Sequence, residues 1–189
     1  MTKWSDESSE ILSLGGWFPG RSIDITCWTD WLEDSGFVIH DPFRSFIAEF
    51  GEIEIEQSGP GIAFRRSTVE FDPSLARGEE ERFLEWSMQV HKQIIPIGEL
   101  DQGRYFLGLD EDFSFYLVVD WLARFGAGKE GLDNLLGGGA FEVLYDQYPA
   151  QLSAVSAILV IVENCGRPRL GGASSRGRSC GGGRPGTAW

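Results

Sequence analysis

Apolar residues recur at helical spacing along the first fifty residues. The clearest helix opens at Asp41 and Pro42, and its apolar side chains repeat at i, i+3, i+4 and i+7: Phe43, Phe46, Ile47 and Phe50. We expect Asp41 to cap this helix, with Pro42 at its first position. Two shorter amphipathic helices precede it. One begins near Ser5 and ends at Gly15, and the other has an apolar face made of Ile25, Trp28, Trp31 and Leu32.

The spacing changes from helical to alternating after Gly51. Residues 53–56 alternate isoleucine with glutamate, which predicts a half-buried strand. A turn at 59–61 is then expected to lead into a returning strand over 62–71. Helical spacing comes back over 79–91, and the side chains expected to face inward there are Phe83, Trp86, Val90 and, as a further candidate, Met88.

The second half of the chain predicts more hairpins and one short helix. Strands over 94–97 and 105–109 flank a loop at 101–103, and a turn at 110–112 leads into a strand over 113–119. A helix is expected over 129–136, where three glycines follow. These elements predict an α+β domain over residues 4–139, in which an antiparallel β-meander sheet packs with several helices.

The chain after this domain is different in composition. Residues 140–163 keep some amphipathic character and allow one further helical segment. Residues 164–189 consist largely of Gly, Arg, Ser and Pro with almost nothing to bury, so we expect a disordered Gly/Arg-rich tail.

Charge sharpens this picture. The whole chain has a net charge of −13, but the five arginines after Cys165 are accompanied by no acid, so residues 1–164 carry −18. A body this negative repels nucleic acid and anionic membranes and attracts basic surfaces. Many soluble proteins are acidic for solubility alone, and that alternative stays open at this point.

The cysteines and the apolar runs indicate the cellular compartment. Three cysteines are too few and too scattered for a disulfide framework, and Cys27, in an apolar helix, is expected to be a core thiol. The N-terminus has no apolar segment typical of a signal peptide, and the longest apolar run, 152–162, is too short to span a bilayer. We therefore expect a cytoplasmic protein with no membrane contact.

Two motifs invite a cofactor or metal interpretation. Gly126, Gly128 and Gly131 match the letters of the dinucleotide fingerprint GxGxxG, but the expected strand ends before residue 120 and no parallel strand returns, so helix capping is the favoured interpretation. The acids at 110–112 lack the Gly and Glu spacing of an EF-hand loop. We expect no cofactor and no metal.

Catalytic patterns are missing from the sequence. No pair of acids is singled out by spacing, and neither His40 nor His91 accompanies a recognisable nucleophile motif such as GxSxG. The four tryptophans Trp28, Trp31, Trp86 and Trp121 are expected in the core rather than in a ligand pocket. The arginines of the tail could bind RNA, but five of them on so acidic a body favour a solvated tail without direct nucleic-acid binding. We expect a binding protein that is not an enzyme.

Several ordered segments together resemble a known family. In chain order they are WFPGR at 17–21, AEFG at 48–51, FDP at 71–73, EWS at 85–87, PIGE at 96–99, FLGLD at 106–110 and WLARFG at 121–126. This order over residues 4–139 is similar to the third subfamily of the SUKH superfamily of bacterial immunity proteins. The resemblance implies an α+β domain that binds and neutralises a cognate polymorphic toxin, often a nuclease or deaminase. It implies no catalytic residues.

The charge pattern and the resemblance support the same hypothesis. A toxin that acts on nucleic acid needs a basic cleft, and an acidic protein can block that cleft as a phosphate mimic. The candidate contacts are the acids of the first hairpin and those of the 110–112 turn: Glu52, Glu54, Glu56, Asp110, Glu111 and Asp112. The alternative is a general interaction module of the same fold with a partner that is not a toxin.

Overall fold

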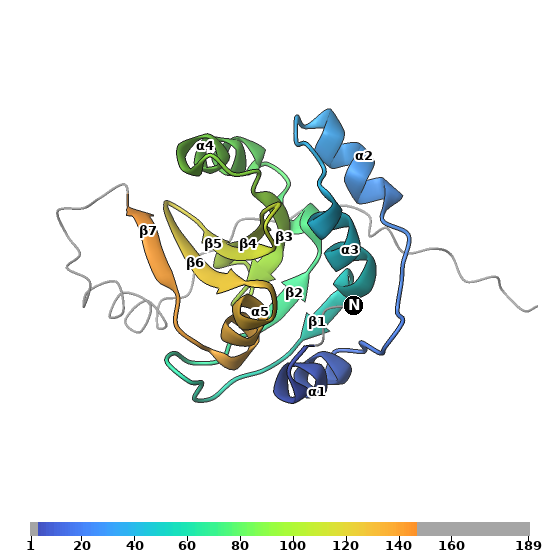
Figure 1. The fold of residues 1–189 in the computed structure, drawn as a ribbon, viewed down its shortest axis with the longest axis vertical. Helices are drawn as coiled ribbons and strands as arrows, with labels where there is room; N and C mark the ends of the chain where they lie inside the picture. Colours follow the sequence, from blue (N-terminus) through green and yellow to red (C-terminus); the bar gives the residue numbers. More distant parts are fainter. Residues whose placement is uncertain (1–3, 147–189) are drawn as a thin grey trace, which may run out of the picture. The chain divides into compact units, whose positions relative to one another are not determined.

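The computed structural model describes residues 4–146, which form five α-helices and one seven-stranded sheet (Figure 1). The helices are α1 (Asp6–Leu14), α2 (Thr26–Asp34), α3 (Asp41–Phe50), α4 (Glu80–Val90) and α5 (Gly128–Gly137), with a short 3-10 helix η1 (Pro73–Ala76). The strands are β1 (Ile53–Ile55), β2 (Val69–Phe71), β3 (Ile95–Leu100), β4 (Tyr105–Leu109), β5 (Ser114–Val118), β6 (Trp121–Ala127) and β7 (Glu142–Asp146).

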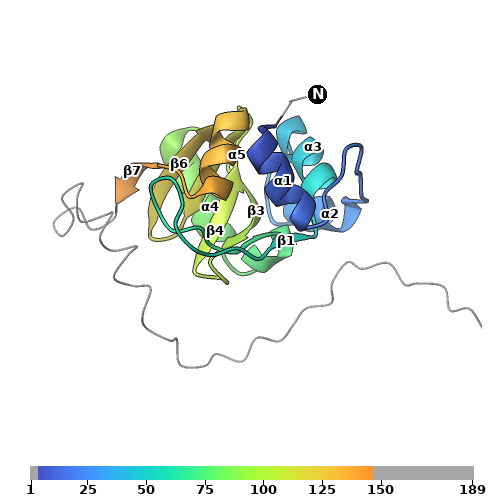
Figure 2. The ribbon, with the colours of Figure 1, turned by 90° about the horizontal axis from the view of Figure 1, so that it is seen from below.

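The sheet is a meander, because every strand pairs antiparallel with the next one along the chain. This confirms the predicted α+β class. Helices α1, α3 and α5 lie on one face and α4 on the other (Figures 1 and 2). Contacts between side chains define the two faces: Phe46 of α3 packs on Phe71 and Phe115, whereas Phe83 of α4 packs on Phe106.

The main core lies between the sheet and α3. The ring of Phe46 sits at its centre, 4.8–5.3 Å from the ring centroids of Phe50, Phe71 and Phe115, in tilted and edge-on arrangements that aromatic pairs prefer. Trp28 of α2 is also buried in the core, and its indole Nε1–H donates to Asp72 at 3.0 Å. The α3 helix forms because its apolar residues share one face, as the i, i+3, i+4, i+7 spacing predicts.

Helix starts agree with the sequence except at α3. Ser5 caps α1 by accepting the amide of Ser8, but the α3 cap is His40, whose Nδ1 accepts the amide of Phe43 at 3.1 Å. Asp41 is therefore the first residue of α3 and not its cap. The reason is that an imidazole nitrogen can accept the orphan amide that a carboxylate usually takes.

Residues 62–68 do not belong to the predicted returning strand, which is only Val69–Phe71. The amides of Ile62, Ala63 and Phe64 instead donate to the carbonyls of Gly137 and Gly138 at the end of α5. This loop satisfies carbonyls that a helix C-terminus leaves unpaired. The prediction was wrong because these hydrogen bonds join segments more than seventy residues apart.

Two strands are missing from the sequence prediction. Trp121–Ala127 forms β6, and Glu142–Asp146 forms β7 within the segment 140–163, where the sequence allowed a further helix. Residues 147–163 and the tail from 164 lie outside the described residues. Because β6 has buried residues on both faces, it lacks the alternation that marks a half-buried strand.

The GxGxxG segment serves helix packing. Gly126 lies within β6, and a Cβ added to Gly131 of α5 would stand 2.4 Å from the carbonyl oxygen of Gly126. These two glycines let α5 approach β6 closely, and only Gly128 stands at a helix start, so the capping interpretation was largely wrong.

Two further side chains differ from expectation. Met88 is 70% exposed on α4, and Cys27 is exposed on α2 and so is not a core thiol. No helix among residues 4–146 has the length and apolar character needed to cross a membrane.

Candidate protein-binding surface

Three glutamates stand directly opposite one another on neighbouring strands. Glu54 of β1 pairs with Glu70 of β2, and Glu70 pairs with Glu99 of β3. Residues paired in this way share one face of the sheet. Glu54 is exposed, and Glu70 and Glu99 are half-buried. We call Glu54, Glu70 and Glu99 the acidic row.

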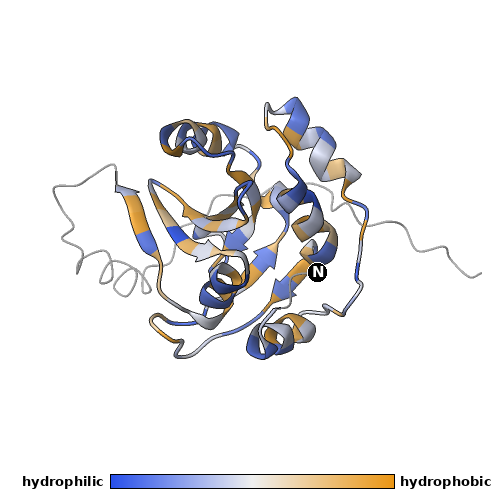
Figure 3. Ribbon diagram, viewed as in Figure 1, coloured by the Kyte–Doolittle hydropathy of each residue, from blue (hydrophilic) through white to orange (hydrophobic). Residues whose placement is uncertain are grey.

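The acidic row continues across the sheet as an apolar row. Beyond Glu99 the paired residues are Phe106, Val118, Leu122 and Tyr145. Helix α4 packs on this apolar part, with Phe83 against Phe106 and Trp86 against Tyr145. The helix therefore packs on the apolar part of this face, while the acidic row beside it keeps Glu54 exposed and Glu70 and Glu99 half-buried. Figure 3 shows hydrophilic and hydrophobic residues alternating along β1 and β2.

Like charges placed directly opposite on adjacent strands destabilise a sheet. Burial raises the pKa of Glu99, and the carboxylates of Glu70, Asp72 and Glu54 raise it further, against a weaker opposite effect of the Gly103 amide. Burial also raises the pKa of Glu70, reinforced by Glu54 and Asp72. The acidic row is thus an electrostatically unfavourable arrangement that a cationic partner would relieve.

The other predicted acids of the first hairpin flank this row. Glu52 precedes and Glu56 follows β1, the edge strand of the sheet. Both are exposed, and Glu52 has a positive φ of 63°. The end of α1 covers the edge of β1, because a Cβ added to Gly15 would lie 3.0 Å from the carbonyl oxygen of Glu54. A charged, covered edge also prevents strand-to-strand association, which is the simplest structural explanation of these acids.

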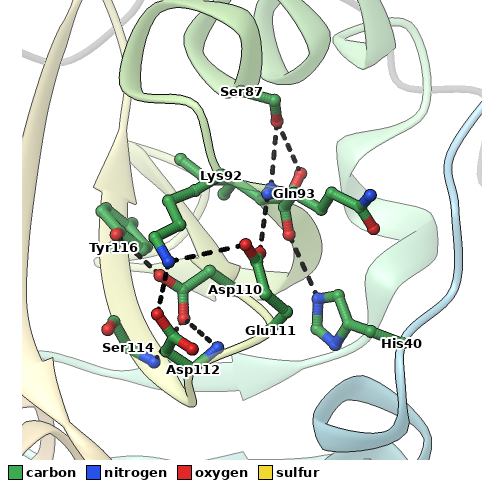
Figure 4. Close-up of polar contacts among 10 residues, drawn as sticks. His40, Ser87, Lys92, Gln93, Asp110, Glu111, Asp112, Ser114 and Tyr116 are labelled. Carbon is green, nitrogen blue, oxygen red and sulfur yellow. Dashed lines mark hydrogen bonds and ion pairs between the residues drawn. The ribbon is translucent and has the colours of Figure 1, made fainter.

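Asp110 is not a surface residue, contrary to the prediction. Its side chain is 1% exposed and accepts three hydrogen bonds, from the amides of Asp112 (2.9 Å) and Ser114 (2.8 Å) and from the hydroxyl of Tyr116 (2.9 Å) (Figure 4). Burial and the Asp110 carboxylate raise the pKa of Tyr116, which keeps this phenol protonated as a donor. Asp110 therefore shapes the β4–β5 turn through a buried carboxylate.

Glu111 and Asp112 are engaged by the loop that follows α4. The ammonium group of Lys92 forms an ion pair with Asp112 and lies 3.6 Å from Glu111, and the amide of Gln93 donates to Glu111 at 2.8 Å (Figure 4). Burial opposes ionisation of Glu111, but the amide donors and Lys92 outweigh it and lower its pKa. Lys92 therefore already neutralises part of the negative charge of this turn.

The structure does not bring the two predicted groups of acids together. Strands β2 and β3 separate β1 from the β4–β5 turn. The turn lies beside the start of β3, where Ile95 pairs with Leu109, whereas Glu99 is near the end of β3. Glu54 is the one predicted residue that belongs to the acidic row.

Sequence reasoning missed Glu70 and Glu99. The alternation Val69-Glu70-Phe71 is a signal that could have placed Glu70 opposite Glu54 in an antiparallel pair. Glu99 has no comparable signal, because the register of β3 shifts between Pro96 and Gly98, and such a bulge reverses which residues face outward.

Chemically, this surface offers carboxylates that can accept charge-assisted hydrogen bonds from Arg and Lys side chains. Among residues 4–146, no three or more His, Cys, Asp or Glu side chains are grouped so as to hold a metal ion.

Comparison with known proteins identifies the family of this chain. The family model described as SUKH-3 immunity protein matches residues 4–138, which confirms the resemblance found in the sequence. No curated protein and no solved structure matches the chain. Because the matching segment spans more than half of the chain, the protein belongs to the SUKH-3 immunity protein family.

Proposed function

We propose that this protein binds a cognate protein toxin in a stoichiometric complex and thereby neutralises it, and that the toxin acts on nucleic acid. Membership of an immunity protein family supports the first part. The acidic row supports the second, since an enzyme that holds a polyanion carries a basic cleft, and carboxylates can occupy that cleft in place of phosphates.

The observation that carries this proposal is the three directly opposed glutamates of the acidic row. Exposed acids scattered over a surface need no partner to explain them. Glu54, Glu70 and Glu99 are different, because they are paired with one another across three strands and burial raises the pKa of two of them. A protein that keeps such repulsion forgoes stability at this place, which is typical of surfaces selected for binding.

Co-expression tests the function itself. The protein encoded by the adjacent gene is expressed alone and together with this protein, and growth is measured. Growth arrest by the neighbour alone, relieved by co-expression, with a one-to-one complex on purification, is the expected result. Growth arrest that persists despite co-expression would contradict the immunity role and favour an interaction module with another partner.

Charge variants then test the surface. The triple variant Glu54→Gln, Glu70→Gln, Glu99→Gln is compared with a matched triple variant at exposed acids of three helices: Glu10→Gln, Glu81→Gln, Glu130→Gln. Both change the net charge equally. We expect the acidic-row variant to lower kon and raise Kd more than the matched variant does, with a weaker dependence on salt than the wild type shows. Equal effects of the two triples would assign the acids to general solubility.

The predicted contacts outside the row are tested in the same assay. Glu52→Lys, Glu56→Lys and Asp112→Lys reverse exposed charges. We expect Glu52→Lys and Glu56→Lys to weaken binding and Asp112→Lys to have the smaller effect, because Asp112 is paired with Lys92. Unchanged kon and Kd in Glu52→Lys and Glu56→Lys would confine the interface to the acidic row.

A further inference from the structure

Phe18 is a large apolar side chain that the fold leaves in solvent. It is 58% exposed in the connection between α1 and α2. Single exposed apolar side chains are common on protein surfaces and need no explanation. What distinguishes Phe18 is how firmly the backbone on both sides of it is held.

Residues 18–21 form a tight turn. Pro19 follows Phe18, Gly20 has a φ of +85°, and the amide of Arg21 donates to the carbonyl of Phe18 at 3.1 Å. Proline at the second position and a glycine with positive φ at the third are the requirements of a type II turn. We call residues 17–21 the Phe18 turn.

Both ends of the Phe18 turn are fastened to α3. On one side the ring of Trp17 stacks on Phe50 with 6.1 Å between centroids, and its Nε1–H donates to the Glu49 carboxylate at 3.0 Å. On the other side the guanidinium group of Arg21 donates to the carbonyls of Glu49 and Gly51, each at 2.7 Å. Arg21 thereby satisfies carbonyls at the C-terminus of α3.

This geometry holds the backbone of Phe18 in place before any partner arrives. A residue on a mobile loop loses conformational entropy on binding, whereas one on a fixed turn has lost most of it during folding. Fixed aromatic side chains of this kind supply much of the binding energy at protein interfaces.

The Phe18 turn lies beside the edge strand β1, on the side of the sheet that α3 covers, whereas the acidic row is on the side of α4. Arg21 contacts the carbonyl of Gly51, the residue before Glu52, and Gly15, two residues before Trp17, lies against the carbonyl of Glu54. The connection between α1 and α2 runs along the outside of α3 and β1 in Figure 1. The segment that the turn contacts carries two acids, Glu49, whose carboxylate accepts the Trp17 indole, and the exposed Glu52. An apolar group beside carboxylates is complementary to an apolar depression bordered by Lys and Arg side chains.

We propose that Phe18 is the apolar anchor of the interface, entering a depression beside the basic surface of the toxin. This inference rests on the proposed function and adds to it the residue that supplies affinity, while the acidic row supplies steering.

The experiment measures binding of the adjacent-gene protein to purified variants of the full chain. We expect Phe18→Ala to raise Kd by about 30-fold or more, mainly through koff, and Phe18→Leu to retain most of the affinity. Met88→Ala, which removes another exposed apolar side chain, from α4, is the control and should leave Kd unchanged. If the wild-type chain does not bind the neighbour at all, the proposed function fails and this inference with it. If the wild type binds and Phe18→Ala binds equally well, only this inference is overturned.

A second pair of variants tests the fixed backbone. Gly20 and Gly36 both have positive φ, and an added Cβ would meet no atom within 4 Å at either site, so Gly20→Ala and Gly36→Ala introduce similar strain in different loops. We expect Gly20→Ala alone to weaken binding, by about fivefold. Equal Kd values in the two variants would contradict a role for the preformed turn. A chain that self-associates through Phe18, shown by sedimentation of wild type and Phe18→Ala, would also overturn the proposal.

Discussion

His40 uses both nitrogens of its ring to join separate parts of the fold. Its Nδ1 accepts the amide of Phe43 at the start of α3, and its Nε2 lies 3.1 Å from the carbonyl of Gln93 (Figure 4). Nδ1 must therefore be unprotonated and Nε2 must carry the hydrogen, which is the neutral imidazole. Burial lowers the pKa of His40, and this outweighs the neighbouring carbonyls and the acids Glu111 and Asp110, which raise it.

The lowered pKa of His40 predicts a pH dependence of stability. A histidine whose folded pKa is depressed contributes stability above its unfolded value, near 6.5, and this is lost as the pH falls through 6.5 towards the folded pKa. We expect the urea midpoint of the wild type to fall between pH 7.5 and 5.5. In His40→Asn this fall should be smaller, because Asn keeps a capping oxygen without titrating. His91→Asn is the control, since Asn tolerates the left-handed backbone at that position. Equal slopes in wild type and His40→Asn would contradict the prediction.

The polar residues of the β4–β5 turn show what sequence can predict at this scale. The sequence correctly predicts a turn at the three acids 110–112. The side chain of Asp110 is nevertheless buried, because the amides of Asp112 and Ser114 and the hydroxyl of Tyr116 all point at it. Which of three adjacent acids turns inward depends on donors contributed by β5, and their positions follow from the folded turn rather than from residue types.

At the scale of elements, amphipathic segments were predicted well and segments buried on both faces were not. The helix of Phe43 and Phe46 and the half-buried strand β1 have one apolar face each, so their spacing indicates their structure. Strand β6 packs against α5 and has buried residues on both faces, so its residues show no clear alternation. The acidic row depends on the pairing of β1, β2 and β3, and for this reason only Glu54 could be placed from the sequence.

The contact between α5 and β6 gives a prediction for two glycines of the same helix. A Cβ at Gly131 would lie 2.4 Å from the Gly126 carbonyl oxygen and 2.8 Å from the Phe115 ring, whereas one at Gly137 would meet only the exposed side chain of Ile62 at 3.3 Å. We expect Gly131→Ala to destabilise the protein by about 1–3 kcal/mol despite the higher helix propensity of alanine. Gly137→Ala should be neutral or slightly stabilising.

Urea unfolding of both glycine variants decides this prediction. A stable Gly131→Ala protein would show that α5 can move away from β6 at little cost, and the close approach inferred from Gly126 and Gly131 would then have no structural role.

At the scale of the whole molecule, the acidic row lies on the part of the sheet that α4 does not pack against. Helices α1, α3 and α5 cover one face, and α4 packs on the apolar row of the other, beside Glu54, Glu70 and Glu99. A protein selected only for stability would gain from neutral residues at Glu70 and Glu99, because burial and the neighbouring acids act against ionisation of both.

Binding and stability are therefore expected to change in opposite directions in Glu70→Gln, Glu99→Gln. The folded-state pKa of each glutamate is raised above 4.5, so the stability that these two groups contribute is greatest below pH 4.5 and is lost as the pH rises through the folded values. The double variant avoids this loss, and at pH 7.5 we expect a gain of about 0.5–1 kcal/mol, or about 1–3 °C in Tm. Near pH 4, where the carboxyls of Glu70 and Glu99 are protonated in the wild type, the two proteins should have the same Tm.

The same variant should bind the toxin more weakly at pH 7.5. A lower Tm at pH 7.5 would mean that the Gly103 amide stabilises ionised Glu99 more than its neighbours repel it, and the acidic row would then be a structural feature of the sheet.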